Sequence, residues 1–542
     1  MTKPRKIAVD LTPILPGGEN GGAKIFVLEL LCQLARLTEN TQLILLTQAC
    51  SHDELAFLDS ANVQRQMVLG SLTTPTVRSR FRQFGTRLVL QLPRRVSAWV
   101  GHTAHQIAIR GSKTMLRDQG IDLLFCPFTA PTYFEPGLPM ICTIYDLQYK
   151  TYPQFFSPED IRHREWTFVE ACRRATAFAA ISDYSRDSAI AHGSLDPARI
   201  RTIHLRMSQR ITSRGDGRPP AVLDRLGLTP ARYLLYPANF WKHKNHEMLL
   251  TAFGIARKQS MPEDIMLVCT GAPGARQEWL MNAARVMNLT DRVLFPGYLP
   301  NTELAALMAN CSGMVFPSMY EGFGLPVIEA MAAGVPVACS NTTSLPEVVG
   351  DGAILFDPRI PTQIAQAMVS LVKDKALCAR LIQAGLQRAR EFSDTERMAK
   401  EYWDLFCFAV ANVKHENLLT GAYADGWAGA QLSAQVAPAS SPQTLELEFT
   451  VPDWLPHEII QVTTLGRGAG ASKIDMRRGQ TTTLTLPFAT TGGSAEIAIT
   501  PTFVPAQTGH GEDGRELSIM LRRCSIVRSA GERVELFPEA GK

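Results

Sequence analysis

Short apolar runs alternate with amphipathic segments from residue 6 to residue 410. The runs have the length and composition of buried β-strands, and the segments between them have helical periodicity. Strands that alternate with helices form parallel sheets covered by helices. The pattern therefore predicts two α/β units. Their strands are expected at residues 6–11, 43–47, 121–125 and 140–144 in the first unit, and at 233–238, 265–270 and 293–295 in the second.

Beyond about residue 420 the pattern changes to short segments of alternating apolar and polar residues, bounded by Gly, Pro, Ser or Asp. Such segments are typical of half-buried strands in an antiparallel sandwich. Strands are expected at residues 445–451, 482–486, 495–499 and 517–521. Trp427 and Trp454 could stack on sugar rings, although core positions are more common for such aromatics. The sequence predicts a C-terminal all-β sandwich domain.

Residues 316–357 have the pattern strand, glycine-rich turn, helix, strand. A glycine-rich turn before a helix N-terminus favours an anion, because unpaired N–H groups and the helix dipole attract negative charge. Glu321 precedes the turn and Glu329 lies in the helix. Carboxylates beside a phosphate site can accept hydrogen bonds from hydroxyl groups of the ligand. The expected ligand is a nucleotide sugar, because it carries both phosphate and hydroxyl groups. The alternative is that both acids are simply solvated.

The run EGFGLPVIEAMAAGVPVACSNTTSLPEVVGDGAILFDP resembles the donor-binding segment of family 4 glycosyltransferases, which have the GT-B fold. By this resemblance Glu329 would hold the ribose hydroxyls and Glu321 would contact the donor sugar. Gly297 would lie on the base side. The backbone of four residues would face the sugar and diphosphate, namely Gly322, Phe323, Gly324 and Leu325.

A second glycine-rich segment, residues 12–23, lies between the first strand and the first helix. It lacks the G-x-G-x-x-G spacing of dinucleotide-binding proteins. In the resembling family this loop folds over the donor phosphates, and Gly21 and Gly22 are the matching positions. A surface turn is the alternative.

The segment YPANFWKHKNHE places Lys242 and Lys244 just after a predicted strand. Two lysines there can neutralise a diphosphate whose charge grows as it leaves. The family pattern pairs an Arg with a Lys. Lys244 matches the Lys, whereas Asn239 stands at the Arg position, so Lys242 would be the substitute. His243 and His246 have metal-like spacing but no carboxylate partner, and we expect no metal and no other cofactor.

The run IYDLQYKTYPQFFS resembles the family segment that usually begins with His-Asp. Tyr145 stands in place of this His, and a tyrosine is a poor base at neutral pH. Tyr145 could instead line a cleft without taking part in chemistry. We expect Asp146 to be an acceptor-side or positioning residue, and we group it with Lys244 and Glu321 as the predicted catalytic residues.

Composition excludes several classes of protein. The 542 residues carry a formal net charge of only +4, which does not suggest a nucleic-acid partner. The 11 cysteines show no CxxC spacing and many lie in apolar runs, as expected of reduced thiols in the cytosol. No secretory segment or membrane-spanning stretch is evident. A cytoplasmic protein is expected.

Residues 75–117 contain no Asp or Glu but many basic residues. Apolar and aromatic residues recur between the arginines, so one or two basic amphipathic helices are expected there. Such helices bind anionic lipid headgroups, which would place the protein on the inner face of the cell membrane. A solvated insertion is the alternative. The basic residues are Arg78, Arg80, Arg82, Arg87, Arg94, Arg95, Arg110, Lys113 and Arg117.

The resemblance implies a GT-B fold, with two Rossmann-like lobes around a cleft, to which the β-sandwich is added. The expected function is retaining transfer of a hexosyl group, with mannosyl favoured, from a nucleoside diphosphate sugar to a glycan or lipid-linked acceptor of bacterial polysaccharide. The alternative is a non-catalytic carbohydrate-binding or scaffold protein derived from such an enzyme. The expected domains are 1–213 on the acceptor side, 221–395 on the donor side, a crossing helix at 396–415 and the sandwich at 425–542.

Overall fold

The computed structural model of the protein divides the chain into two units, Met1–Asn412 and Val413–Lys542, and each is described here by itself. Two segments lie outside the described residues. They are the basic segment 75–117, apart from Leu116, and residues 213–220, where the sequence SRGDGRPP predicts a linker between the two α/β units. The structure describes residues 3–16, 21–70, 116, 119–129, 132–135, 137–207, 221–412, 417–423, 425–466, 473–508, 513, 515–528 and 531–537.

The first lobe of the first unit is built on a seven-stranded sheet of order β3-β2-β1-β4-β5-β6-β7, in which every described pair of strands is parallel. Its strands are β1 Lys6–Asp10, β2 Gln42–Gln48, β3 Val63–Leu69, β4 Leu123–Cys126, β5 Met140–Ile144, β6 Ala177–Ala180 and β7 Ile200–Thr202. Its helices include α1 Gly21–Leu37, α2 Ala49–His52, α6 Gln148–Thr151, α7 Pro158–Arg174 and α8 Asp183–Gly193.

The second lobe is built on a six-stranded parallel sheet of order β10-β9-β8-β11-β12-β13. Its strands are β8 Tyr233–Pro237, β9 Met266–Thr270, β10 Val293–Gly297, β11 Gly313–Phe316, β12 Val337–Ser340 and β13 Ala353–Phe356. Its helices are α9 Ala221–Leu226, η4 Lys242–Lys244, α10 His246–Gln259, α11 Ala275–Val286, α12 Asn301–Asn310, α13 Leu325–Ala332, α14 Leu345–Val349, α15 Pro361–Lys373 and α16 Lys375–Glu391.

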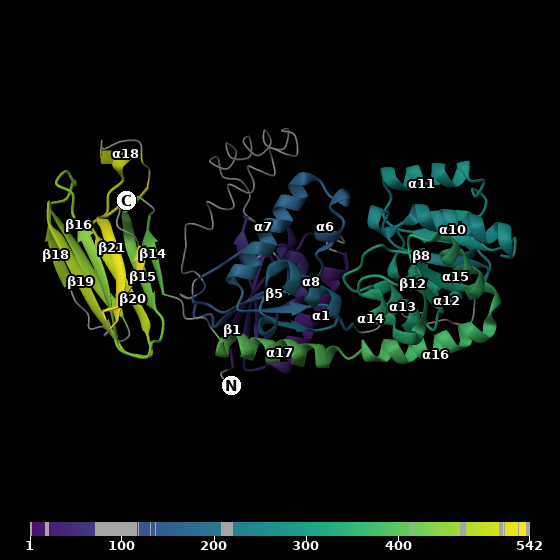
Figure 1. Ribbon diagram of the computed structural model, residues 1–542, viewed down its shortest axis with the longest axis horizontal. Coiled ribbons are helices and arrows are strands. Elements are labelled where there is room, and N and C mark those ends of the chain that lie inside the picture. Colours follow the sequence, from purple (N-terminus) through teal and green to yellow (C-terminus); the bar gives the residue numbers. More distant parts are fainter. Residues whose placement is uncertain are drawn as a thin grey trace. The chain divides into compact units, whose positions relative to one another are not determined.

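Helix α17, Thr395–Ala411, follows the second lobe but packs against the sheet of the first (Figure 1). Its Tyr402 ring lies 5.6 Å from that of Phe125 and 6.2 Å from that of Phe26. Because these rings are buried, the helix ties the end of the second lobe to the core of the first. No helix within the described ranges is both long and apolar enough to cross a membrane.

The second unit is an antiparallel sandwich of two sheets, β14-β15-β20-β17-β18 and β19-β16-β21-β22. The inner faces of both sheets contribute to one apolar core, which explains the alternating sequence pattern. Four predicted strands are present, although β21 begins at Met520 rather than at residue 517. The strands are β14 Leu418–Ala422, β15 Ala428–Val436, β16 Gln443–Thr450, β17 Ile459–Gly466, β18 Lys473–Arg477, β19 Thr481–Phe488, β20 Gly493–Thr500, β21 Met520–Arg528 and β22 Arg533–Phe537.

Trp427 and Trp454 of the sandwich belong to one aromatic cluster with Phe503. The three rings make edge contacts, with centroids 5.6 to 5.9 Å apart. Phe503 is buried, whereas Trp454 is 47% exposed. Trp427 packs against the apolar core, so it has a structural role.

Candidate active site

A cavity of about 690 Å³ opens between the two lobes of the first unit. Basic and aromatic side chains predominate among its lining residues, which makes it suitable for an anionic ligand with a flat ring. The first lobe contributes Asp146, Gln148, Phe155, Phe156 and Arg164. The second lobe contributes Phe240, Trp241, Lys242, His243, Lys244, Arg276, Tyr320, Glu321 and Gly322.

Lys244 and Glu321 form an ion pair at this cavity, with 2.6 Å between Lys244 Nζ and Glu321 Oε1. Both side chains are largely buried, at 14% and 12% exposure. Lys244 ends the single turn η4 that follows β8, and the Tyr236 hydroxyl of that strand donates a hydrogen bond of 2.7 Å to the Lys244 carbonyl. The lysine therefore has a fixed backbone position at the carboxyl end of the sheet, where ligands of such sheets bind.

Asn245 turns the chain from η4 into α10 with a left-handed backbone, at φ 62°. Asparagine tolerates this conformation better than most residues. Its side-chain amide donates to the carbonyls of Pro317 and Pro358, at 3.1 and 2.8 Å. The turn that carries Lys244 is thus anchored directly to the end of β11.

Glu321 belongs to residues 321–324, here called the EGFG loop, which connects β11 to α13. Ser344 Oγ donates to the carbonyls of Glu321 and Phe323, at 3.0 and 3.1 Å. Gly324 has φ +109°, which favours glycine, and it immediately precedes α13. The loop is therefore held from within its own lobe by a serine hydroxyl.

Asp146 reaches the cavity from the first lobe, just after β5. Its Oδ1 accepts a hydrogen bond of 3.1 Å from the Gln148 amide. Burial raises the pKa of the Asp146 carboxyl above its usual range, and the negative charge of Glu321 acts in the same direction. The cavity thus brings together all three predicted catalytic residues, Asp146, Lys244 and Glu321.

Residues 226–388 match the family of glycosyl transferases group 1. The sequence is 31% identical over 253 residues to O-antigen chain mannosyltransferase B of Escherichia coli, a match that covers 47% of this chain and 66% of that protein. The chain has the GT-B fold, and its second lobe carries a segment that matches this glycosyltransferase family. It is also 29% identical over 223 residues to the serotype-specific mannosyltransferase WbdA of Escherichia coli. That match covers 41% of this chain and 27% of WbdA. The matches thus cover only part of the length of each of these two relatives.

Solved structures confirm the predicted GT-B fold of this chain. Anabaena HepE in complex with UDP and glucose matches 74% of this chain and 100% of its own, with a TM-score of 0.53 and 18% identity. WaaG, a glycosyltransferase involved in lipopolysaccharide biosynthesis, matches 74% of this chain and 99% of its own, with a TM-score of 0.51 and 15% identity. At these identities the likeness concerns the fold alone.

Tyr145, at the usual His position of the resembling family, is buried among aromatic side chains. Its hydroxyl is buried without a hydrogen-bond partner among the described residues, and burial raises its pKa well above the usual range. The ring lies between those of Phe26 and Phe128, at 6.1 and 6.2 Å. Tyr145 does not line the cavity, so we assign it to packing.

Asn239, at the usual Arg position, stabilises a turn. Its Oδ1 accepts a hydrogen bond of 2.9 Å from the Ala272 amide. Lys242, the predicted substitute, does line the cavity. Two further cationic residues, Arg164 on α7 and Arg276 on α11, also line the cavity. Neither was predicted from the sequence. Arg276 follows the turn after β9, so its place at the carboxyl end of a strand was a usable signal.

The other predicted binding residues lie outside the cavity lining. Gly21 and Gly22 belong to the first turn of α1 rather than to the predicted loop, and a Cβ on Gly22 would lie 3.1 Å from the Leu325 side chain of the other lobe. The Phe323 ring packs on Phe392, at 5.3 Å. The remaining four are Gly297 at the end of β10, Gly324 before α13, Leu325 at the start of α13, and Glu329 half-buried within α13.

His243 and His246 flank Lys244 in sequence. Burial, followed by the positive charge of Lys244, lowers the pKa of His243 to about 4 and that of His246 to about 3. His246 packs between the rings of Tyr236 and Phe240, at 4.7 and 4.9 Å. Both histidines are therefore neutral at pH 7, and the cationic character of this wall comes from lysine and arginine.

Proposed function

We propose that this glycosyltransferase moves a hexosyl group, with mannosyl favoured, from a nucleoside diphosphate sugar to a glycan or lipid-linked glycan acceptor. The observation that carries the proposal is the Lys244–Glu321 pair facing Asp146 across one cavity. The pair belongs to the segment that matches the group 1 family, so it would bind the donor. Asp146 belongs to the other lobe and would face the acceptor.

The choice of a mannosyl donor is supported by the relatives named as mannosyltransferases. A nucleoside diphosphate donor is supported by the likeness to HepE, whose structure contains UDP. The four cations of the cavity also fit a diphosphate, because exposed and half-buried guanidinium and ammonium groups bind phosphate oxygens strongly. They are Lys242, Lys244, Arg164 and Arg276.

The proposed reaction retains the configuration at the anomeric carbon. The acceptor hydroxyl attacks this carbon on the face from which the diphosphate leaves, and the acceptor proton passes to the departing diphosphate oxygen. One carbon–oxygen bond forms to the acceptor as the bond to the diphosphate breaks. Lys244 would stabilise the growing charge on the diphosphate, so this step requires no metal or other cofactor.

A carbohydrate-binding or scaffold protein without activity is the second candidate. It is favoured by Tyr145, whose buried hydroxyl cannot replace the missing histidine. The two candidates differ in one measurable property, because only an enzyme turns over the donor.

A panel of nucleoside diphosphate sugars, incubated with the full chain and a short mannan acceptor, tests the proposal. We expect release of the nucleoside diphosphate from one mannosyl donor and an α-linked product by NMR when the donor is α-linked. No release from any donor would favour the binding protein. An inverted product would contradict the retaining reaction.

The acceptor would be presented at the cytoplasmic face of the cell membrane. This part of the proposal is supported only by the sequence of residues 75–117, in which arginines alternate with apolar residues and no acid occurs. A lipid-linked acceptor would then be encountered on the same surface.

A further inference from the structure

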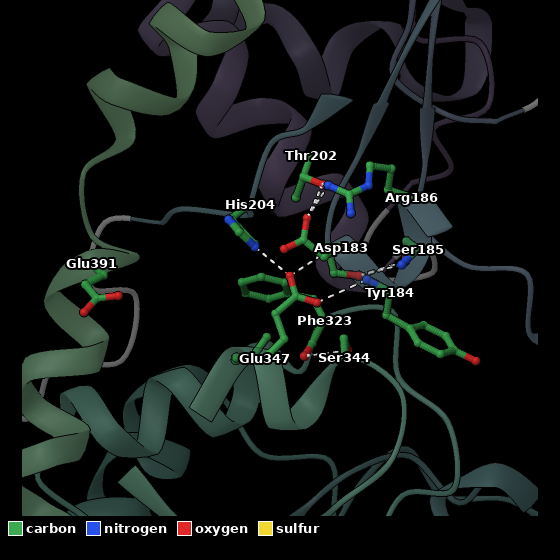
Figure 2. Close-up of polar contacts among 12 residues, drawn as sticks. Asp183, Tyr184, Ser185, Arg186, Thr202, His204, Phe323, Ser344, Glu347 and Glu391 are labelled. Atoms are coloured by element: carbon green, nitrogen blue, oxygen red, sulfur yellow. Dashed lines mark hydrogen bonds and ion pairs between the residues drawn. The ribbon is translucent and has the colours of Figure 1, made fainter. Parts of the chain in front are cut away.

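One carboxylate of the second lobe binds the first turn of a helix in the first lobe (Figure 2). Glu347 of α14 accepts hydrogen bonds from the amides of Asp183 and Tyr184, at 2.7 and 3.1 Å. These amides open α8, where backbone N–H groups have no partner within the helix. Ser182 Oγ accepts from the third amide, that of Ser185, at 3.0 Å. The helix start is thus capped from both lobes.

The charges around Glu347 favour this contact. His204 Nε2 lies 2.7 Å from Glu347 Oε1, and the positive end of the α8 dipole faces the carboxylate. The nearby Asp183 carboxylate turns instead to Arg186 and Thr202, at 2.8 and 2.6 Å. The ligand atoms of Asp183, His204 and Glu347 lie within 4.8 Å of one another, but hydrogen bonds already engage them, so we do not assign a metal site there.

The segment that carries Glu347 also holds the EGFG loop. Ser344, three residues earlier, binds the carbonyls of Glu321 and Phe323. From the first lobe, Ser185 Oγ donates to the Tyr145 carbonyl at 2.9 Å and lies 3.4 Å from the Gly322 carbonyl. The segment 344–347 therefore contacts the donor-side loop through Ser344 and the lobe that carries Asp146 through Glu347.

Arg388 of α16 fixes α14 from behind. Its guanidinium donates to the backbone carbonyls of Val348 and Glu347, at 2.9 and 2.5 Å. The short helix therefore cannot rotate freely, and Glu347 remains directed at the first lobe.

We propose that Glu347 is a positioning residue, which holds the lobes together so that Asp146 faces Lys244 and Glu321. The proposal rests on the proposed function, because it gives Glu347 a part in the glycosyl transfer reaction. Glu347 lies outside the lining of the cavity, so it acts through the position of the lobes and not by touching the donor.

Glu347→Gln is the decisive variant, because the neutral amide has the same shape but only one acceptor oxygen. The first amides of α8 should then lose protection from hydrogen exchange. Exchange at the amides of residues 183 and 184 should become at least about tenfold faster. Turnover should fall by about tenfold or more through misplacement of Asp146, while donor affinity stays within about twofold. The matched control is Glu303→Gln, an acid of α12 that pairs with Arg225 of α9 inside the second lobe and does not contact α14 or Arg388. It should leave all three measurements unchanged.

Unchanged exchange at the two amides in Glu347→Gln, or a loss of donor affinity as large as the loss of turnover, would overturn the proposal. If this variant does not fold, His204→Asn removes a partner of the same carboxylate from the first lobe and should raise exchange at the same amides. An inactive parent protein would contradict the proposed function alone, because the exchange comparison requires no turnover.

Discussion

Gly322 lies against Tyr145 so closely that a Cβ on the glycine would be 2.3 Å from the tyrosine carbonyl oxygen. Real Cβ atoms do not approach a backbone oxygen to that distance, so any side chain at residue 322 must displace one lobe from the other. The close approach of the two lobes at the cavity therefore requires glycine here.

Gly322→Ala should lower turnover by up to roughly a hundredfold, because a small displacement of catalytic groups has large kinetic effects. Initial rates with the donor found in the panel would measure this loss, and calorimetry would show that the variant still folds. Gly254→Ala is the matched control, since the nearest heavy atom to its new Cβ is 3.9 Å away. Equal rates for Gly322→Ala and the parent would show that the lobes need not approach this closely.

Lys244→Ala should lower turnover by roughly a hundredfold or more, which is the size of effect expected for one preorganised charge-stabilising group. The loss should appear in kcat, because charge grows on the diphosphate only as the bond breaks. Steady-state kinetics of Lys244→Ala and Lys242→Ala would compare the two lysines. A larger effect at Lys242, which is exposed, would transfer the role to that residue.

Lys244→Ala leaves the Glu321 carboxylate without its ion-pair partner, and this side chain is only 12% exposed. A buried unpaired charge can itself lower turnover, so a separate control is needed. The double variant Lys244→Ala with Glu321→Gln removes this charge. If it stays as slow as Lys244→Ala while Glu321→Gln alone is faster, the ammonium group itself is required. Recovered turnover would mean that the bare carboxylate caused the loss.

Individual helices and strands could be predicted from the sequence where one local signal determines their position. Strand β5 coincides with the predicted residues 140–144, since all five of its residues are buried and four of them are apolar. The sequence predicts a helix at residues 162–177, whereas α7 begins at Pro158, four residues earlier. The sequence held the signal for this start, because Ser157 and Asp160 form a capping box and Pro158 occupies the first turn.

The site depended on contacts that no local pattern contains. Lys244 and Glu321 are 77 residues apart, and each was predicted from its own motif, but their pairing follows from the order of β8 and β11 in the sheet. Arg164 and Arg276 lie on helices, and only the packing of the lobes brings them to the cavity. The contact of Glu347 with α8 was missed for the same reason.

Glu329→Ala should weaken donor binding by roughly ten- to a hundredfold, if its carboxylate holds the ribose hydroxyls as the resemblance implies. Folding should be preserved, because Glu329 is half-buried on one face of α13. Calorimetric titration with the donor measures the affinity, with Glu303→Ala of α12 as a control for the loss of an acid. Unchanged affinity would remove Glu329 from the binding site.

His246→Phe should make the stability of the first unit less dependent on pH. The pKa of His246 is about 3 in the folded protein and 6.5 in an ordinary environment, so between these values the unfolded chain binds more protons. The free energy of unfolding is therefore unaffected by His246 above pH 6.5. It decreases as the pH falls below that value, by roughly 2 kcal/mol at pH 5. Phenylalanine retains the packing between Tyr236 and Phe240 and has no proton to bind.

The thermal midpoint, measured by calorimetry from pH 5 to pH 8, would test this expectation. His246→Phe should have a smaller fall between pH 6.5 and pH 5 than the parent. His243→Asn should also reduce the fall, because burial lowers the pKa of His243 to about 4. Parallel curves for His246→Phe and the parent would contradict the assignment of a buried neutral imidazole.

The basic segment 75–117 should bind anionic membranes. Each cation near such a surface contributes on the order of 1 kcal/mol, so three or four engaged arginines would hold the protein there reversibly. In sedimentation, the protein should pellet with vesicles that contain phosphatidylglycerol and not with neutral vesicles. High salt should release it, because exposed charges are screened over about a Debye length. Replacing Arg78, Arg80, Arg82 and Arg87 by Glu should abolish binding, whereas equal behaviour of variant and parent would favour a soluble acceptor.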